Sequence, residues 1–224
     1  MDVKDALLKR ISVRVFKPDP VPLALVREII DVARYAPSGG NLQPWRVIAV
    51  AGEAKQAVID SARDAMGSNP RGNEDAERPV YPENLWEPFR TRRYKVGEDM
   101  YALLGIPRED RPARFAHLAR NYLFFDAPVG LFFVIDRGMG HGQWAHLGMF
   151  MQSVALAATE RGLATCMQEA WARVRETLAR HFALPAQEMI YCGMALGYAD
   201  ESAPVNSLRS ARAPLDEIAE FRGF

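Results

Sequence analysis

The amino-acid sequence predicts an α+β fold in one domain that spans residues 1–224. Short apolar runs rich in β-branched residues, typical of buried strands, alternate with segments whose apolar residues recur at helical spacing. No strand is followed by G-x-G-x-x-G, so a Rossmann nucleotide-binding unit is not supported. The length allows one large domain or two small ones, and we predict one because no linker or internal repeat divides the chain.

The first part of the chain is expected to form three helices and one strand. Pro22 is typical of a helix start, and Val26, Ile29, Ile30 and Ala33 follow it on one face. The expected elements are a helix over 2–9, a helix over 22–37, a strand over 45–51 and a helix over 53–66.

Residues 67–97 differ from the segments around them, because they contain four prolines, many charges and several aromatic residues. A long irregular segment in a compact domain usually acts as a lid or a binding loop. A partly disordered excursion is the alternative, although disordered segments are usually poor in aromatics. We therefore expect a lid, with Trp86, Phe89 and Tyr94 as candidates for contact with a substrate.

The second half of the chain is expected to place a long apolar helix, residues 143–161, among buried strands. This helix is apolar on more than one face, so it must be buried in the core or in a subunit interface. Gly162 favours a left-handed cap that ends it. The expected elements are helices over 98–104, 108–125, 143–161 and 171–182, and strands over 129–136, 163–167 and 189–196.

Charge and cysteine content narrow the class of protein. Lys plus Arg and Asp plus Glu number 28 each, so no overall field recruits nucleic acid or an anionic membrane, and any anion site must be local. Cys166 and Cys192 lie in apolar surroundings without a Cys/His cluster, which favours buried thiols, a reducing cytoplasm and no metal site. Without an apolar signal sequence or a bilayer-length apolar run, we expect a soluble cytoplasmic protein.

Residues 36–45, A-P-S-G-G-N-L-Q-P-W, join a helix to a strand in a loop of unusual composition. Its prolines remove backbone donors, and its two glycines let backbone N–H groups approach a ligand closely. Ser38, Asn41 and Gln43 add polar side chains. A plain connection between the two elements is the alternative, since such loops are often rich in these residues.

Near the N-terminus, Arg10, Ser12 and Arg14 form R-x-S-x-R. In an extended segment this alternation directs all three side chains to one face. Two guanidinium groups and a hydroxyl on one face suit a phosphate or another anion, through charge-assisted hydrogen bonds.

These two motifs, in this order, resemble the nitroreductase family of FMN-dependent oxidoreductases. The resemblance covers most of the chain and includes the buried helix before Gly162, the G-L-A-T-C-M-Q-E-A segment after it, and the basic pair Arg209 and Arg212. Residues 94–106 and 121–144 are most similar to the branch that includes nitrobenzoate reductases. The resemblance implies a three-layer α/β/α sandwich, with a central sheet between helices, that forms an intertwined homodimer whose C-terminal tail crosses onto the partner.

The resemblance also implies a non-covalent FMN at the dimer interface. Basic residues and Ser12 would hold its phosphate and ribityl end, and Arg14 would lie near the pyrimidine edge. Residues 37–39 would come from the partner subunit, and a backbone N–H near Gln168 would face flavin N5. The implied cofactor-binding residues are Arg10, Ile11, Ser12, Arg14, Pro37, Ser38, Gly39, Asn41, Gln43, Asn121, Met167, Gln168, Glu169, Arg209 and Arg212.

Alternatives remain for individual residues. Arg209 and Arg212 could pair with Asp216 or Glu217 on the tail, and Asn121 could be an ordinary helix residue. The family often has a proline shortly before the position of Gln168, where this chain has Cys166 and Met167, so the local geometry is left open. The arginines of 90–93 are expected to form a solvated face, with a nicotinamide cofactor's phosphate as the alternative contact.

The activity implied is that of an FMN-dependent NAD(P)H oxidoreductase. Hydride would pass from NAD(P)H through flavin N5 to nitroaromatic, quinone or related acceptors in a ping-pong scheme, without a catalytic side chain. Alternatives are another flavin reaction of the family, such as reductive dehalogenation, flavin fragmentation or enone reduction, and a non-catalytic flavin-binding sensor or store. The four histidines lack ligand or triad spacing and are expected to be structural. The expected partners are a second copy of the chain and a small-molecule acceptor, and no nucleic acid or membrane.

Overall fold

The structure is a computed structural model, and it describes residues 1–67, 69, 71–72, 74 and 80–224. In this described part, four strands form a sheet in the order β1-β2-β4-β3, and every neighbouring pair is antiparallel. The strands are β1 (Arg46–Ala51), β2 (Val129–Asp136), β3 (Ala164–Gln168) and β4 (Glu188–Gly197). Each lies within one residue of its predicted bounds, because β-branched and aromatic residues mark buried strands clearly.

Helices connect the strands. The α-helices are α1 (Val3–Lys9), α2 (Leu23–Ala33), α3 (Gly52–Met66), α4 (Phe89–Leu103), α5 (Arg111–Ala119), α6 (His141–Glu160), α7 (Arg175–His181) and α8 (Leu215–Ile218). Shorter 3₁₀ segments are η1 (Gly39–Asn41), η2 (Arg120–Asp126), η3 (Glu169–Val174) and η4 (Pro204–Ser207). The predicted end of α6 is confirmed, since Gly162 adopts φ +75° directly after its last turn.

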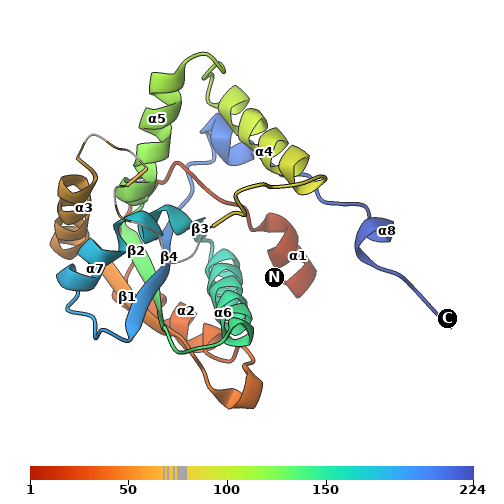
Figure 1. The fold of residues 1–224 in the computed structure, drawn as a ribbon, viewed down its shortest axis with the longest axis horizontal. Helices are drawn as coiled ribbons and strands as arrows, with labels where there is room; N and C mark the ends of the chain where they lie inside the picture. Colours follow the sequence, from red (N-terminus) through yellow and green to blue (C-terminus); the bar gives the residue numbers. More distant parts are fainter. Residues whose placement is uncertain (68, 70, 73, 75–79) are drawn as a thin grey trace.

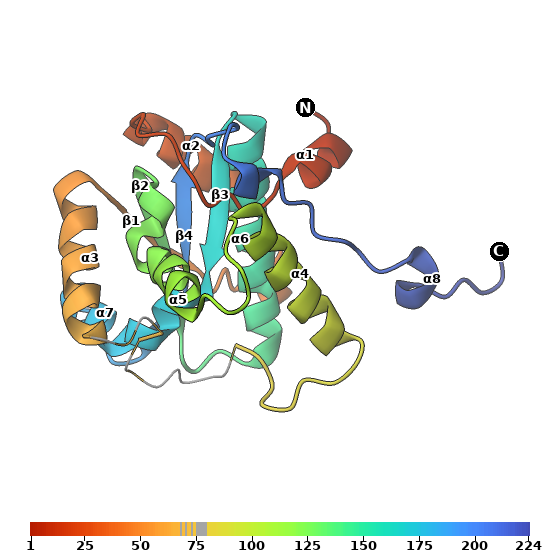
Figure 2. The same cartoon turned by 90° about the horizontal axis from the view of Figure 1, so that it is seen from above.

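The sheet is the middle of three layers, as the predicted sandwich requires. Along β2, Leu131 and Phe133 pack with α2 and α6, whereas Phe132 and Val134 pack with α3, α7 and η3. This alternation follows from the two-residue period of a strand, and it buries β2 on both faces. Figure 2 shows α3 and α7 on one side of the sheet and α6 on the other.

Residues 10–16 lie along the free edge of β3. Ser12 pairs with Thr165 in a parallel bridge, and the Val13 amide donates to the Thr165 carbonyl at 3.0 Å. Val13 is buried, so its neighbours Ser12 and Arg14 point to the opposite face. The predicted extended R-x-S-x-R segment is therefore present.

Asn206, in η4, fixes this segment from the other side. Its Oδ1 accepts from the Arg14 amide, and its Nδ2 donates to the carbonyls of Val15 and Asp200, each at 2.8 Å. Asn206 is buried, so these three bonds satisfy groups that water does not reach. They also bring the C-terminal basic pair to the N-terminal segment.

The predicted irregular stretch 67–97 is wrong over its last residues, because α4 begins at Phe89 rather than at 98. No residue of α4 is buried in the chain, so the helix lacks the apolar stripe that sequence reasoning depends on. Charged residues with good helix propensity form it instead. The part of this prediction that falls on 68, 70, 73 and 75–79 lies outside the described residues.

Two other predicted helices are interrupted. The helix predicted over 108–125 ends at Ala119 and continues as η2, where Phe124, Phe125 and Asp126 have positive φ angles of 52°, 51° and 65°. The helix predicted over 171–182 is η3 followed by α7. In both places aromatic side chains turn into the core, and the ring centroids of Phe124 and Trp171 lie 4.6 Å apart. Packing therefore overrides local helix propensity.

The C-terminal tail leaves the body of the molecule. Figure 1 shows α8 and the C-terminus projecting away from the layers. Leu215, Ile218 and Phe221 are more than half exposed there. A tail that buries so little of its apolar surface needs another surface to cover it.

Candidate active site

A basic cavity lies between α1, the extended segment and the tail. Its volume is about 310 Å³, and its wall includes Arg10, Ile11, Ser12, Arg14, Arg209 and Arg212. The sequence predicted these residues from two distant segments, and the fold brings them to one cavity. Val96 of α4 also lines the cavity, a contribution that no sequence pattern indicated.

The positive charge of this cavity is not neutralised within the described residues. Burial and the like charge of Arg212 lower the pKa of Arg10. Among described side chains, no carboxylate pairs with the cavity arginines; three of them, Arg14, Arg209 and Arg212, donate to backbone carbonyls or to Ser210 Oγ instead. Glu217 pairs with Arg92 of α4, so the suggested pairing with the tail arginines is absent for this residue. The cavity therefore has the charge that an anion requires.

A second cavity, of about 750 Å³, extends from the end of β3. Its wall includes Asn121, Met167, Gln168 and Glu169, four residues of the predicted site. Much of the wall is apolar, with Met151 of α6 among its residues. Such a cavity suits a flat ring system with a few polar groups.

Gln168 is a structural residue on this wall. Its side chain is buried, Nε2 donates to the Asn121 carbonyl at 2.8 Å, and Oε1 accepts from Trp171 Nε1 at 3.4 Å. These bonds hold η2, β3 and η3 together. They occupy the side-chain amide of Gln168, which therefore does not face a ligand. What remains for a ligand at this position is the backbone.

Glu169 stands beside Gln168 and is open to solvent on one side. Partial burial on the other side raises the pKa of its carboxyl. Burial raises the pKa of Tyr191, which lines the same cavity, and the negative charge of Glu169 raises it further. Cys166 and Cys192 are free and buried as predicted, and burial raises the pKa of both thiols. They are unreactive core residues rather than nucleophiles.

His117 of α5 is close enough to Arg14 of the basic cavity to be affected by its charge. It is 7% exposed, and its Nε2 has no hydrogen-bond partner among the described residues. Burial, together with the charges of Arg14 and Arg120, lowers its pKa to about 4. His117 is therefore neutral at pH 7, packed between the rings of Tyr101 and Phe125.

The 37–43 loop is not part of either cavity. The amide of Gly39 lies 3.4 Å from Nδ1 of His146, and its carbonyl lies 3.5 Å from Nε2 of Gln143, both on α6. Ser38 Oγ accepts from the Gln43 amide at 2.9 Å, and Asn41 and Gln43 adopt positive φ angles. The chain by itself thus separates Pro37, Ser38, Gly39, Asn41 and Gln43 from the rest of the predicted site.

The predicted substrate residues are exposed and lie outside both cavities. Trp86, Phe89 and Tyr94 are 59%, 44% and 51% exposed, and none belongs to the wall of the 750 Å³ cavity. The residues of the 67–97 stretch that reach the wall are Arg71, Val80, Tyr81 and Arg93, and Arg173 and Tyr191 come from later in the chain. Arg93 belongs to the run expected to form a solvated face, with a nicotinamide cofactor's phosphate as the alternative contact. Motif reasoning missed the others, because they come from separate segments without a shared pattern.

Two general properties of the described residues bear on the site. No helix that the structure describes has the length and apolar character needed to cross a bilayer. Within the same part of the chain, no group of three His, Cys, Asp or Glu side chains is placed to hold a metal ion.

Comparison with known proteins gives matches over nearly the whole chain. The nitroreductase family model matches residues 7–198. A 4-nitrobenzoate reductase of Pseudomonas putida is 39% identical over 226 residues, which cover 100% of this chain and 96% of that protein. A nitrobenzene nitroreductase of Ectopseudomonas oleovorans is 37% identical over 219 residues, with 98% and 96% covered. The crystal structure of the FMN and NADPH-dependent nitroreductase NfnB from Sphigopyxis sp. strain HMH has a TM-score of 0.95 at 44% identity and covers 100% of both chains.

Proposed function

Because this chain belongs to the nitroreductase family, we propose that it is an FMN-dependent enzyme that passes reducing equivalents from NAD(P)H to nitroaromatic acceptors. One observation carries the proposal: the R-x-S-x-R segment and the C-terminal arginines converge on one basic cavity, where no described carboxylate pairs with them. Full-length relatives are named for nitroarene reduction, which gives the acceptor class. The free and buried thiols are compatible with a cytoplasmic enzyme.

The residues present fit FMN. Its phosphate is a dianion, and the basic cavity offers guanidinium groups and the Ser12 hydroxyl without a described carboxylate partner. Its ring system is flat and mostly apolar, and the 750 Å³ cavity beyond Met167 has that character. Arg14 belongs to the basic cavity, and its charge acts on the thiol of Cys166, which directly precedes Met167 on the wall of the second cavity. One extended ligand can therefore use both regions.

Each group of residues would have a distinct role. Arg10, Ser12, Arg209 and Arg212 would hold the phosphate and ribityl end. Bound FMN would supply the ring that accepts and donates hydride. Arg14 would place a fixed positive charge at the pyrimidine edge, where negative charge develops on reduction, and so favour that step.

The apolar wall beside Met167 would exclude water and hold one planar molecule at a time against the ring. NAD(P)H and the acceptor would then use the same space in turn, which is a ping-pong order. Quinones and activated alkenes are flat acceptors of similar size, so we include them in the proposed range.

We infer that the working unit is a homodimer. Within the chain, the loop of Ser38 and Gly39 lies on α6, away from both cavities, and a second copy could present its own loop to them. Exposed apolar residues on α1, the tail and α6, such as Leu8, Ile218 and Met149, supply surface for such a contact.

The test is an anaerobic titration of the FMN-loaded protein with NADH and then NADPH, followed by addition of nitrobenzene. We expect either nucleotide to bleach the flavin band and the acceptor to restore it. A protein that binds no FMN, or that stays oxidised with both nucleotides, would contradict the proposal and favour a flavin-binding sensor or store.

A further inference from the structure

Three arginines line the 750 Å³ cavity at positions that the roles above do not use. Arg71 follows α3, Arg93 is in the second turn of α4, and Arg173 is in η3. The basic cavity has its own four arginines, so this is a separate group of positive charges.

The backbone holds two of these arginines together. Arg173 Nε lies 3.4 Å from the Arg71 carbonyl oxygen, and the Glu74 amide donates to the Arg173 carbonyl at 3.1 Å. Gly72 lies so close that an added Cβ would be 2.6 Å from the Cβ of Arg173. The segment that carries Arg71 is thus packed directly against η3.

Aromatic rings orient the outer guanidinium groups. Arg93 lies over the ring of Tyr81, with 4.0 Å between its Cζ and the ring centroid, and Arg71 lies over Phe115 at 5.1 Å. These cation–π contacts leave the edges of the guanidinium groups able to donate hydrogen bonds. No carboxylate pairs with Arg71, Arg93 or Arg173 among the side chains that the structure describes.

Among the described residues, the charge of the cavity wall is therefore positive on balance. Three arginines oppose one described carboxylate, that of Glu169. The remaining wall is largely apolar and includes Met151, Met167 and the buried Tyr122. A ligand that matches both features has an aromatic ring and an anionic substituent.

We propose that Arg71, Arg93 and Arg173 form a carboxylate-recognition site, so that the enzyme prefers nitroaromatic acids to neutral nitroarenes of the same size. The inference rests on the proposed function and names its substrate class. Arg173 is the inner member because it is half-buried, and its planar group can bind a carboxylate through two parallel hydrogen bonds.

NADPH also carries anionic groups, and its 2′-phosphate is the other chemical source for such contacts. We assign the site to the acceptor because the arginines share the cavity with Met167 and Gln168, where the acceptor ring must lie. The 2′-phosphate lies at the far end of the dinucleotide from the reacting nicotinamide ring. The experiment below separates these two sources.

The test compares 4-nitrobenzoate with 4-nitrobenzamide, a neutral acceptor of nearly the same shape, on the FMN-loaded enzyme. We expect kcat/KM to favour the acid, mainly through KM. In Arg173→Gln this acid-to-amide ratio should fall about tenfold, the loss of one charge-assisted hydrogen-bonded contact. Arg173→Lys should retain part of the preference. Arg93→Gln lies on an exposed helix, so it tests the same site even if the substitution of Arg173 disturbs the folding of η3.

The matched control is Arg34→Gln, which removes one positive charge from an exposed ion pair with Asp31, outside both cavities. Its acid-to-amide ratio should equal that of the native enzyme. Binding without turnover provides a second readout, in which benzoate and benzamide are titrated into the oxidised enzyme and followed by the flavin spectrum. Benzoate should bind more tightly, and added salt should weaken it.

An equal preference for acid and amide, unchanged in Arg173→Gln and Arg93→Gln, would overturn the inference. The inference would also be overturned if the arginine variants lost kcat/KM for NADPH but kept it for NADH, because the arginines would then bind the 2′-phosphate of the nucleotide. Failure of both acceptors, with a flavin that NAD(P)H does not bleach, would contradict the proposed function. Benzoate binding would still test the arginines in that case, so the two failures are distinguishable.

Discussion

At the scale of single residues, like charges in the basic cavity repel each other, and a bound anion would reduce this repulsion. Arg10 and Arg212 are close enough for the second to lower the pKa of the first, and neither has a carboxylate partner among the described residues. An anion bound between them removes this unfavourable contact and gains charge-assisted hydrogen bonds. The same residues therefore disfavour the empty cavity slightly and favour the occupied one.

This balance gives a prediction for Arg212→Gln. FMN should bind about tenfold or more weakly, because one charge-assisted contact is lost. The flavin-free variant should be at least as stable as the native protein, because a like charge has been removed. Fluorescence titration with FMN and urea unfolding without it measure the two effects. Arg222→Gln, which breaks only an ion pair with Glu220 on the exposed tail, should change neither.

His117 gives a pH-dependent prediction. Its folded pKa of about 4 lies below the usual histidine value of 6.5, so the unfolded chain binds more protons between these values. The contribution of His117 to the unfolding free energy should therefore be complete above pH 6.5. On acidification to near pH 4, the loss from this residue should reach about 3 kcal/mol.

The measurement is urea unfolding between pH 7 and pH 4.5 in the native protein and in His117→Phe. Phenylalanine can keep the contacts with Tyr101 and Phe125 and has no unpaired nitrogen. Its acid-induced loss should be smaller, and its stability at pH 7 should be undiminished. Equal acid sensitivity in both proteins would show that other groups determine the pH dependence.

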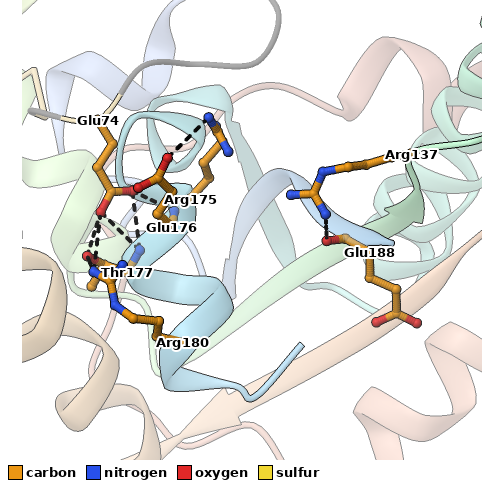
Figure 3. A network of polar contacts seen from close by, with 7 residues as sticks. All are labelled: Glu74, Arg137, Arg175, Glu176, Thr177, Arg180 and Glu188. Atoms are coloured by element: carbon orange, nitrogen blue, oxygen red, sulfur yellow. Dashed lines mark hydrogen bonds and ion pairs between the residues drawn. The ribbon is translucent and has the colours of Figure 1, made fainter. Parts of the chain in front are cut away.

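At the scale of elements, α7 depends on a residue far away in the sequence. Glu74 accepts hydrogen bonds from the amides of Glu176 and Thr177, at 2.5 Å and 3.0 Å, and from the Thr177 hydroxyl at 2.6 Å (Figure 3). These amides belong to the first turn of α7, which has no cap from its own N-terminal flank. Glu74 thus caps the helix and fastens the segment of Arg71 to it.

We predict that Glu74→Ala lowers the unfolding free energy by about 1–2 kcal/mol, as expected for the loss of a helix cap. Hydrogen exchange should become faster in α7 first, because its first-turn amides lose their acceptor. Glu74→Gln should lie between the two proteins, since an amide oxygen can still accept. Glu83→Ala, in the exposed part of the same segment, should match the native protein, and similar losses in both alanine variants would contradict the capping role.

At the scale of the whole molecule, the tail carries apolar residues that the chain does not cover. Ile218 is 69% exposed and Phe221 is 64% exposed, and Figure 1 shows this segment extended away from the layers. An ion pair between Arg92 and Glu217 joins the tail to α4. The surface left over is suited to a second copy of the chain.

Light scattering should accordingly give a mass twice the 25.1 kDa of the chain. The double variant Ile218→Asp and Phe221→Asp should shift this toward the monomer and lower FMN occupancy, because the partner's loop would be lost. Glu53→Lys, on α3 on the far side of the sheet, should remain dimeric (Figure 2). A native protein that is a stable monomer with full FMN occupancy would contradict the proposed dimer.

The strands, α6 and the basic residues were predictable because each leaves a local signal. Phe132 and Phe133 lie in a continuous apolar run, and Gly162 marks a helix end. Arg10, Ser12 and Arg14 alternate along an extended segment, so their common face follows from strand geometry. The start of α4 was not predictable in this way, because a helix without a buried stripe has no periodic pattern.

By itself, the sequence pattern determined the strands, most of the helices and the shared face of the R-x-S-x-R side chains, because hydrophobic period and alternation are properties of neighbouring residues. The three-layer order and the grouping of the C-terminal arginines with this segment followed from the resemblance to the nitroreductase family. Only the tertiary structure placed Arg71, Arg93 and Arg173 on one cavity wall and turned the Gln168 amide into the core. Such contacts join segments up to 102 residues apart. Their proximity depends on how the layers pack, which no local pattern records.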